Sequence, residues 1–376
     1  MRISHNLTGI TWDHARGFDS VVNSNQYLQN HIGTSIEWRC RSLLAFGDQK
    51  IEEFYKNYDL MVIDYPHIPD AVSANAVLAL EDFISAKDIS TLAAESVGNS
   101  YESYAFQGKH WAFALDSAAQ VSAYRPDKSD YSPITWGDVI AIGKSGKLLW
   151  PYKPVDAFST FATLCAQLGS PLSVGENLLN KSVATEALSL MLEMAHLVPE
   201  FCSKFNPIDT LETLAKEADF SHAVALYGYS NYSRKNYRNH TIIFEDIPSF
   251  DMQASGAILG GTGIAISSAS NNPTAAFAAA LVLTGAKVQS TIYTLSGGQP
   301  ANLRAWKNLE CNLLTNNFFQ NTLRTLERAW TRPNVIGWPD IQMAISKIIY
   351  TSLIEKKING FDVDRISQIL DINQQK

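Results

Sequence analysis

Residues 12–16 read Trp-Asp-His-Ala-Arg, so an indole, a carboxylate, an imidazole and a guanidinium stand within one short segment. An indole can stack on a sugar ring or another planar ligand, and a guanidinium can hydrogen-bond to a carboxylate or to a pair of hydroxyls. The segment follows an apolar run at residues 7–11 and precedes Gly17, after which a helical pattern begins. We interpret it as part of a ligand-binding site. The alternative is a capped turn, with Asp13 as the helix cap and Trp12 in the core.

Two further carboxylates stand where an apolar run ends or is interrupted. The nearly continuous apolar run at residues 59–64 ends at Asp64, and His67 follows closely. Asp64 can accept hydrogen bonds from neighbouring hydroxyls of a ligand, or it can cap the turn that follows it. Asp116 interrupts the apolar stretch 111–124. Because an unpaired buried carboxylate is costly, Asp116 needs a partner: a ligand, an arginine or backbone amides.

Aromatic residues end two predicted strands in the middle of the chain. Trp150 and Tyr152 end the predicted strand at residues 147–152, and Tyr229 ends the predicted strand at residues 222–229. Such side chains can form the walls of a ligand site or pack in a core, and alternation along the second strand favours Tyr229 over its neighbour two residues earlier.

The last candidates lie in two loops. Gly261 and Thr262 belong to Leu-Gly-Gly-Thr-Gly, which matches neither the Walker A nor the dinucleotide-binding pattern; it either lets backbone amides approach a ligand or makes a bend. Arg332 and Trp338 lie between two predicted C-terminal helices, where Trp338 could instead anchor the packing. The candidate ligand-binding residues are therefore Trp12, Asp13, His14, Arg16, Asp64, His67, Asp116, Trp150, Tyr152, Tyr229, Gly261, Thr262, Arg332 and Trp338.

Alternating strands and helices must position these residues. Residues 7–11, 35–40 and 59–64 predict strands, and residues 18–31 predict a helix between the first two. This order predicts a parallel sheet covered by helices, whose ligand crevice lies at the carboxyl ends of the strands. Further along, Thr135 and Asn272 are predicted helix N-caps, with Pro273 at the first helical position.

Composition narrows the function classes. A net charge of −7 on 376 residues argues against nucleic acid as the main partner, because phosphate binding needs a basic surface. No apolar run is long enough to cross a bilayer. The four cysteines form no metal-binding pattern and most stand in apolar contexts, which indicates buried thiols. We expect no metal and no cofactor.

Several segments, in order, resemble the carbohydrate-binding branch of the extracellular solute-binding proteins that serve ABC importers, the branch that includes the maltose-binding protein. The resemblance rests on GFDSVVNSNQYLQNHIGTSIEW, YAFQGKHWAFALDSAAQVSAYRPD, PITWGDVIAI, ADFSHAVALYGYSNYS and LGGTGIAISSASNNPTAAFAAALVLTGAKVQSTIYTLSGGQPAN. No single motif is specific; their shared order over most of the chain carries the resemblance.

The resemblance implies an α/β fold of two lobes (the type II periplasmic-binding-protein fold), each a mainly parallel sheet flanked by helices, with a C-terminal helical segment. Residues 1–116 with 256–308 would form lobe one, and residues 117–255 with 309–376 would form lobe two, with a ligand cleft between them. It further implies a monomer that binds a small polar solute, a carbohydrate or a related acid, and delivers it to an ABC importer permease. The fourteen candidates would then contact the ligand.

Two alternatives stay open at this stage. The sequence as given shows no secretory signal peptide, although the family is periplasmic or extracellular, so a cytoplasmic sensor or scaffold with the same fold is one alternative. The other is an enzyme that uses Asp13 and His14, with Asp64 or Asp116, as an acid/base set. The enzyme is the weaker alternative, because no GxSxG, HExxH or catalytic cysteine context is present.

Overall fold

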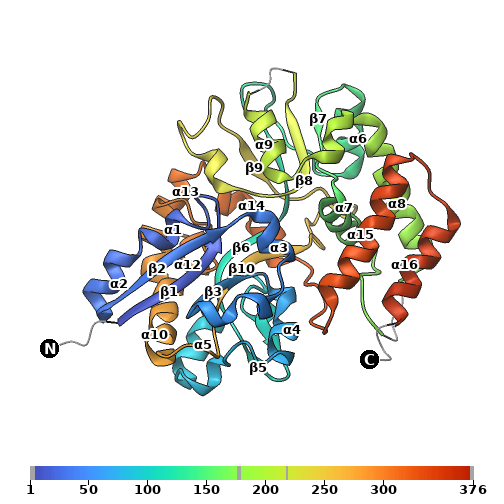
Figure 1. Ribbon diagram of the computed structural model, residues 1–376. Helices are drawn as coiled ribbons and strands as arrows, with labels where there is room; N and C mark the ends of the chain where they lie inside the picture. Colours follow the sequence, from blue (N-terminus) through green and yellow to red (C-terminus); the bar gives the residue numbers. More distant parts are fainter. Residues whose placement is uncertain (1–4, 176–178, 217–218, 373–376) are drawn as a thin grey trace. The chain divides into compact units, whose positions relative to one another are not determined.

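The computed structural model describes residues 5–175, 179–216 and 219–372, which form two compact units (Figure 1). Unit 1 contains the residues up to Ser117 together with Gly260–Leu314 and Asn334–Gly337. Unit 2 contains Ala118–Leu259, Thr315–Pro333 and the residues from Trp338 onward. Two long strands carry the chain from one unit to the other: β6 (Phe113–Tyr124) leaves unit 1 and β10 (Leu259–Ile266) returns to it.

The sheet of unit 1 has the strand order β2-β1-β3-β10. Strand β1 (His5–Trp12) is parallel to β2 (Thr34–Arg41) and to β3 (Leu60–Ile63), and β10 is antiparallel to β3. All four residues of β3 are buried, which explains its continuous apolar sequence. The parallel sheet predicted from the first third of the chain is therefore present.

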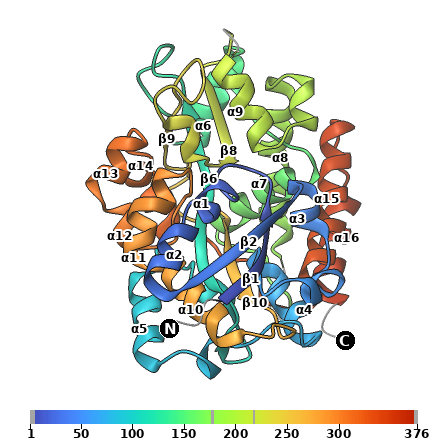
Figure 2. The same ribbon diagram turned by 60° about the vertical axis from the view of Figure 1, so that its left-hand side comes forward.

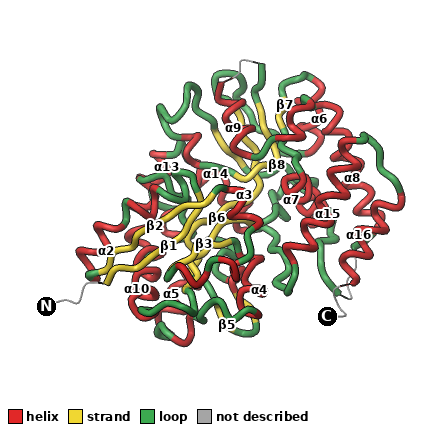
Figure 3. The backbone as a smooth tube through the Cα atoms, viewed as in Figure 1, coloured by secondary structure: helices red, strands yellow, loops and turns green. Residues whose placement is uncertain are grey.

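Helices α2 (Asn25–Ile32) and α10 (Pro273–Thr284) pack against each other, and Figures 2 and 3 show them beside the strands of unit 1. Leu28 and Phe277 join Ile36 and Val62 of the sheet in one apolar cluster, the core of this unit. The other elements of unit 1 are α1 (Asp19–Val22), α3 (Leu43–Asp48), α4 (Ile68–Ser73), α5 (Ala86–Glu95), β4 (Ala105–Phe106), β5 (Lys109–His110), α11 (Ala286–Val288), α12 (Leu303–Trp306) and α13 (Leu309–Leu314).

The single helix predicted over residues 18–31 is divided into α1 and α2. The hydroxyl of Ser20 donates to the carbonyl of Arg16, and the hydroxyl of Ser24 donates to the carbonyl of Ser20. Serine hydroxyls that bond to the preceding turn bend helices, which accounts for a break that apolar spacing alone does not reveal.

The sheet of unit 2 contains the second half of β6 and three shorter strands. Strand β8 (His222–Tyr227) and strand β9 (Ile243–Glu245) are both antiparallel to β6, whereas β7 (Leu148–Leu149) is parallel to β8. The expectation of a mainly parallel sheet thus holds in unit 1 but not in unit 2, because the long crossing strand β6 runs against its neighbours here.

Helices dominate the rest of unit 2. Helix α15 (Trp338–Ile354) packs against α7 (Pro154–Gln167), α8 (Lys181–Leu197) and α16 (Gly360–Ile372), so the predicted C-terminal helical segment is present (Figure 1). The other helices of unit 2 are α6 (Trp136–Lys144), α9 (Pro207–Lys216) and α14 (Phe318–Glu327).

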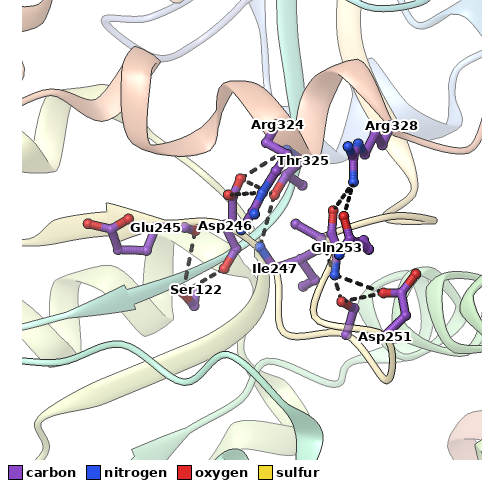
Figure 4. Close-up of polar contacts among 11 residues, drawn as sticks. Ser122, Glu245, Asp246, Ile247, Asp251, Gln253, Arg324, Thr325 and Arg328 are labelled. Carbon is purple, nitrogen blue, oxygen red and sulfur yellow. Dashed lines mark hydrogen bonds and ion pairs between the residues drawn. The ribbon is translucent and has the colours of Figure 1, made fainter.

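A polar network fastens the segment between β9 and β10 to α14 (Figure 4). The carboxylate of Asp246 accepts hydrogen bonds from the backbone amide and the hydroxyl of Thr325, and its carbonyl accepts one from Ser122 of β6. Arg328 donates to both the carbonyl and the side-chain oxygen of Gln253, each at 2.9 Å. The chain therefore approaches β10 along a fixed path within unit 2.

Among the described residues, no single helix combines the length and apolar character that a membrane span requires; α10 and the helical turns through Tyr293 meet that test only as a pair bent by 46°. All four cysteines are free thiols, and Cys165, Cys202 and Cys311 are buried while Cys40 is exposed.

Gly17 packs so closely that it offers a test of the unit 1 core. A Cβ atom at this position would lie 2.3 Å from the indole of Trp12, which is itself only 3% exposed. We expect Gly17→Ala to destabilise unit 1 by about 1–3 kcal/mol, the usual cost of overpacking. Thermal unfolding followed by circular dichroism measures this as a lower midpoint.

Gly47→Ala is the matched control, because nothing lies within 4 Å of a Cβ atom there and the residue is in helix α3. This variant should keep or slightly raise the midpoint. Equal midpoints for the two variants would contradict the packing argument.

Candidate ligand-binding site

Strand register brings several predicted residues of unit 1 to one edge of its sheet. Ile10 pairs with Met61 in parallel, so Asp13 and Asp64, three residues further on in each chain segment, follow the same ends of β1 and β3. Thr262 precedes the residue of β10 that pairs with the last residue of β3. Asp13, Asp64 and Thr262 therefore share the edge at which parallel α/β sheets bind ligands.

The polar groups at this edge have different surroundings. Asp13 is exposed, and its backbone amide donates to the carbonyl of Arg41 at 2.8 Å. The Nδ1 atom of His14 accepts the backbone N–H of Arg16, which leaves the proton of a neutral imidazole on Nε2. Asp64 accepts the backbone N–H of Tyr65 at 2.9 Å and so caps the short 3₁₀ helix that ends at the half-buried His67.

Thr262 and Gly261 illustrate two different roles on β10. The Thr262 hydroxyl is buried and has no hydrogen-bond partner among the described residues, so it is a ready hydrogen-bonding group. Gly261 has a φ of +117°, and a Cβ atom there would lie 2.3 Å from the carbonyl oxygen of Asp116. The backbone of β6 alone therefore requires glycine at position 261.

Arg16 and Asp116 bind each other. The Nε atom of Arg16 donates to one carboxylate oxygen of Asp116 at 2.8 Å and Nη2 donates to the other at 2.5 Å, with both side chains buried. Burial raises the pKa of the Asp116 carboxyl, and the guanidinium opposes that rise. The partner that Asp116 needs is thus an arginine 100 residues away in sequence. The pair connects the loop after β1 to β6, and contact of either side chain with a ligand stays a prediction.

Trp12 packs in the core of unit 1. Its ring belongs to the apolar cluster of unit 1 and lies 5.3 Å from the ring of Phe46. The alternative reading of Trp12, as a packing residue at the end of a strand, describes the structure better.

In unit 2, the residues after β7 form a buried aromatic pair. Trp150 is fully buried, its indole N–H donates to the hydroxyl of Thr160, and its ring stacks on Tyr152 at 4.9 Å. Because its N–H is satisfied within the protein and its ring is buried, Trp150 packs as a core residue. Tyr152, also buried, is the member of the pair nearer the start of α7.

The other predicted residues of unit 2 lie at strand or helix ends. Tyr229 follows β8 and is nearly buried. Trp338 begins α15 and packs edge-on against Phe158 of α7, and its indole N–H has no partner among the described residues. Arg332 is buried, and its Nη1 atom lies 3.4 Å from the side-chain oxygen of Gln342.

Sequence reasoning missed Asp156 and Asn231. Asp156 is 4% exposed in the first turn of α7, and Asn231 is buried just after β8; each has a buried side-chain oxygen without a partner among the described residues. Burial raises the pKa of Asp156 to about 7, Lys153 opposes this and Asp209 adds to it. An acid in the first turn of a helix is common, so residue type alone does not mark Asp156 as a candidate. The only indication in the sequence is that both residues come after a predicted strand.

These edges supply hydrogen-bonding groups rather than a reactive centre. The unpartnered oxygen atoms of Asp156, Asn231 and Thr262 and the indole N–H of Trp338 match a ligand rich in hydroxyls. No group of three or more metal-binding side chains occurs within the described ranges. A surface groove of about 710 Å³ in unit 1 lies between α5 and α12 and contains none of these residues. We favour the residues named above because they carry the unmatched buried polar groups.

Removal of the Asp116 charge should destabilise unit 1 strongly. Asp116→Asn removes the negative charge that pairs with the buried Arg16, so we expect a loss of about 3–5 kcal/mol in the free energy of unfolding. The double variant Arg16→Met with Asp116→Leu should lose less than the sum of its single changes. Urea unfolding measures the free energy of unfolding of each variant. Glu37→Gln is the control: it breaks the exposed pair with Arg39 and should change the free energy of unfolding by less than about 1 kcal/mol.

Asp156 should make the stability of unit 2 depend on pH. Its pKa rises from 3.8 to about 7 on folding, so the folded state holds a proton that the unfolded chain has lost. Stability then falls as pH rises from about 4 to 7 and stays constant above, by up to ~4 kcal/mol at about 1.4 kcal/mol per pKa unit. Asp156→Asn should therefore be more stable than the wild type at pH 8 and nearly equal to it at pH 4.

Urea unfolding at the two pH values gives the comparison. Asp130→Asn removes an exposed carboxylate of the same unit and should leave the pH dependence unchanged. If the free energies of unfolding of Asp156→Asn and the wild type differed by the same amount at every pH, the Asp156 carboxyl would not be the source of the pH dependence.

The comparisons with known proteins show the fold. No family model and no curated protein matches the chain. Among solved structures, maltose-bound MalE3 of T. maritima is similar with a TM-score of 0.81 and 15% identity over 98% of this chain and 99% of that one. An ABC transporter solute-binding protein of Agrobacterium radiobacter K84 in complex with ribitol has a TM-score of 0.80 at 14% identity, covering 99% of each chain.

A solute-binding protein of Thermotoga lettingae TMO, bound with alpha-D-tagatose, has a TM-score of 0.79 at 16% identity and covers 98% of this chain and all of that one. These similarities extend over nearly the whole length of both chains in each case. The chain therefore has the two-lobed α/β fold of the solute-binding proteins of ABC transporters.

Proposed function

We propose that this protein binds a small polyhydroxylated solute, a carbohydrate or a related acid, as the substrate-binding component of an ABC import system. One observation carries the proposal: buried hydrogen-bonding groups without a partner, Thr262 in unit 1 and Asp156, Asn231 and Trp338 in unit 2, occur in a fold whose solved neighbours hold a sugar or a polyol. Each unit offers a different part of such a site.

Unit 1 supplies the polar part. Asp13 and Asp64 can accept hydrogen bonds from ligand hydroxyls, and the Thr262 hydroxyl can donate or accept. His14 and His67 flank them on the loops after β1 and β3. We retain these five residues, and Gly261 as the backbone element beside Thr262, from the sequence candidates.

Unit 2 supplies the aromatic part. Tyr152, Tyr229 and Trp338 offer rings with a polar tip, which suits the alternation of apolar faces and hydroxyls on a sugar. Asp156 and Asn231 add acceptors at the ends of the neighbouring strands, and Arg332 adds a donor.

We propose binding without catalysis. In this arrangement the His14 imidazole is engaged by the backbone of its own loop through Nδ1, and the acids stand at separate strand ends instead of forming a nucleophile–base pair. An importer permease is the proposed protein partner, by analogy with the solute-binding proteins of the same fold.

Isothermal titration of the full chain tests the proposal, with maltose, ribitol, tagatose, mannitol, galactose, galacturonate, sorbitol and gluconate as ligands. We expect a dissociation constant in the micromolar range or below for at least one of them. Asp13→Asn should weaken that binding about tenfold, the value of one charge-assisted hydrogen bond, at an unchanged melting temperature.

Asp19→Asn is the matched control, because Asp19 is also exposed and lies six residues further along the same segment. It should bind like the wild type. Absence of binding across the whole panel would overturn the proposed function. Equal losses of affinity in Asp13→Asn and Asp19→Asn would overturn the role of Asp13.

A further inference from the structure

Arg41, the last residue of β2, is a buried cation that no sequence motif singled out. Its side chain packs against two aromatic rings, with the guanidinium carbon 4.3 Å from the centre of Phe54 and 5.3 Å from that of Phe46. The residue is 9% exposed. No carboxylate of a described residue forms an ion pair with it.

Most of the hydrogen-bonding capacity of Arg41 is unused. A guanidinium has five N–H donors. Nη1 donates to the side-chain oxygen of Gln49 at 3.3 Å and Nη2 to the carbonyl of Val62 at 3.4 Å, both beyond the usual N–H···O range. Nε is buried and has no partner. Three N–H groups therefore remain, enough for one carboxylate bound by two hydrogen bonds.

Other buried arginines of this chain show what Arg41 lacks. Arg16 forms two hydrogen bonds with Asp116, and the fully buried Arg125 forms two with Asp127, at 3.0 and 2.6 Å. Because an uncompensated buried charge costs several kcal/mol, the chain pairs these arginines with its own acids. Burial accordingly lowers the pKa of Arg41 to about 10.

Arg41 also lies at the edge where unit 1 presents its polar groups. It pairs in register with Trp12, and its carbonyl accepts the backbone N–H of Asp13. The cation therefore stands next to the loop that carries the acceptors for ligand hydroxyls.

We propose that Arg41 binds the carboxylate of the solute, so that the ligand is a sugar acid and not a neutral sugar. This rests on the proposed function and deepens it: Asp13 and Asp64 accept hydrogen bonds from the hydroxyls, while Arg41 pairs with the acid group. The hydroxyls of a neutral sugar can accept hydrogen bonds from Arg41 but leave its buried charge uncompensated. A carboxylate accepts two of these hydrogen bonds and compensates the charge as well.

Two matched ligand pairs test the proposal by calorimetry on the full chain: galacturonate against galactose, and gluconate against sorbitol. We expect the wild type to bind the acid of at least one pair tenfold or more tightly than its neutral partner. Arg41→Leu should lose that difference by weakening the acid alone, and Arg41→Lys should keep part of it, because a lysine retains the charge without the paired geometry. Arg39→Leu, an exposed arginine two residues earlier on β2, should bind both ligands like the wild type.

If Arg41→Leu does not fold, the wild-type comparison still decides the matter, since an acid that raises the melting temperature no more than its neutral partner contradicts the proposal. Equal loss of acid and neutral binding in Arg41→Leu would assign the residue to packing, and tighter binding of galactose 6-phosphate than of either acid would overturn the carboxylate assignment. Binding of neutral solutes alone would leave the proposed function standing and remove this inference, whereas no binding in any arm would remove both.

Discussion

The buried pair between Arg16 and Asp116 holds the functional edge of unit 1 in place. It connects the loop after β1 to the beginning of β6, two segments that no backbone ladder joins at this point. The same stretch of β6 is fixed by Gln299, whose side chain donates to the carbonyl of Ser117. With these contacts formed, the backbone of β10 can approach β6 only through Gly261. A charge pair, an amide and a glycine thus determine where Asp13 and Thr262 lie.

The buried polar groups of this chain separate into two kinds. Some are matched within the protein, such as Asp116 with Arg16 or Arg125 with Asp127. Others, such as Asp156 and Arg41, are buried with much of their bonding capacity unused. The matched groups stabilise the fold, since removal of one partner would leave the other as an uncompensated charge in the apolar interior. Unmatched buried groups are costly unless something else binds them, which is why we propose them as ligand-binding groups.

The sequence predicted the frame of the molecule well. The strands of the first third, the Thr135 cap with its reciprocal bond from Asp138, and Pro273 at the first position of α10 all depend on local spacing and appear as expected. The edge that carries Asp13 and Asp64 follows from parallel pairing alone.

The contacts of individual side chains were harder to predict, because they depend on segments that are distant in the sequence. Nothing near Asp116 in sequence indicates that its partner is Arg16. Trp12 and Trp150 stand at strand ends, where a ring can turn outward or inward, and tertiary packing turned both inward. Arg41 and Asp156 stand at sequence positions where an arginine and an aspartate are common. Only the structure, in which each has a buried atom without a hydrogen-bond partner, identifies them as candidates.

The division of the chain has a consequence for biosynthesis. The neighbour of β3 in the sheet, β10, is synthesised some two hundred residues after it, and unit 1 is completed only by Asn334–Gly337. Neither unit is a continuous stretch of polypeptide, so unit 1 cannot finish folding before these residues have been synthesised. The pairing of β3 with β10 therefore forms late relative to the pairing of β3 with β1.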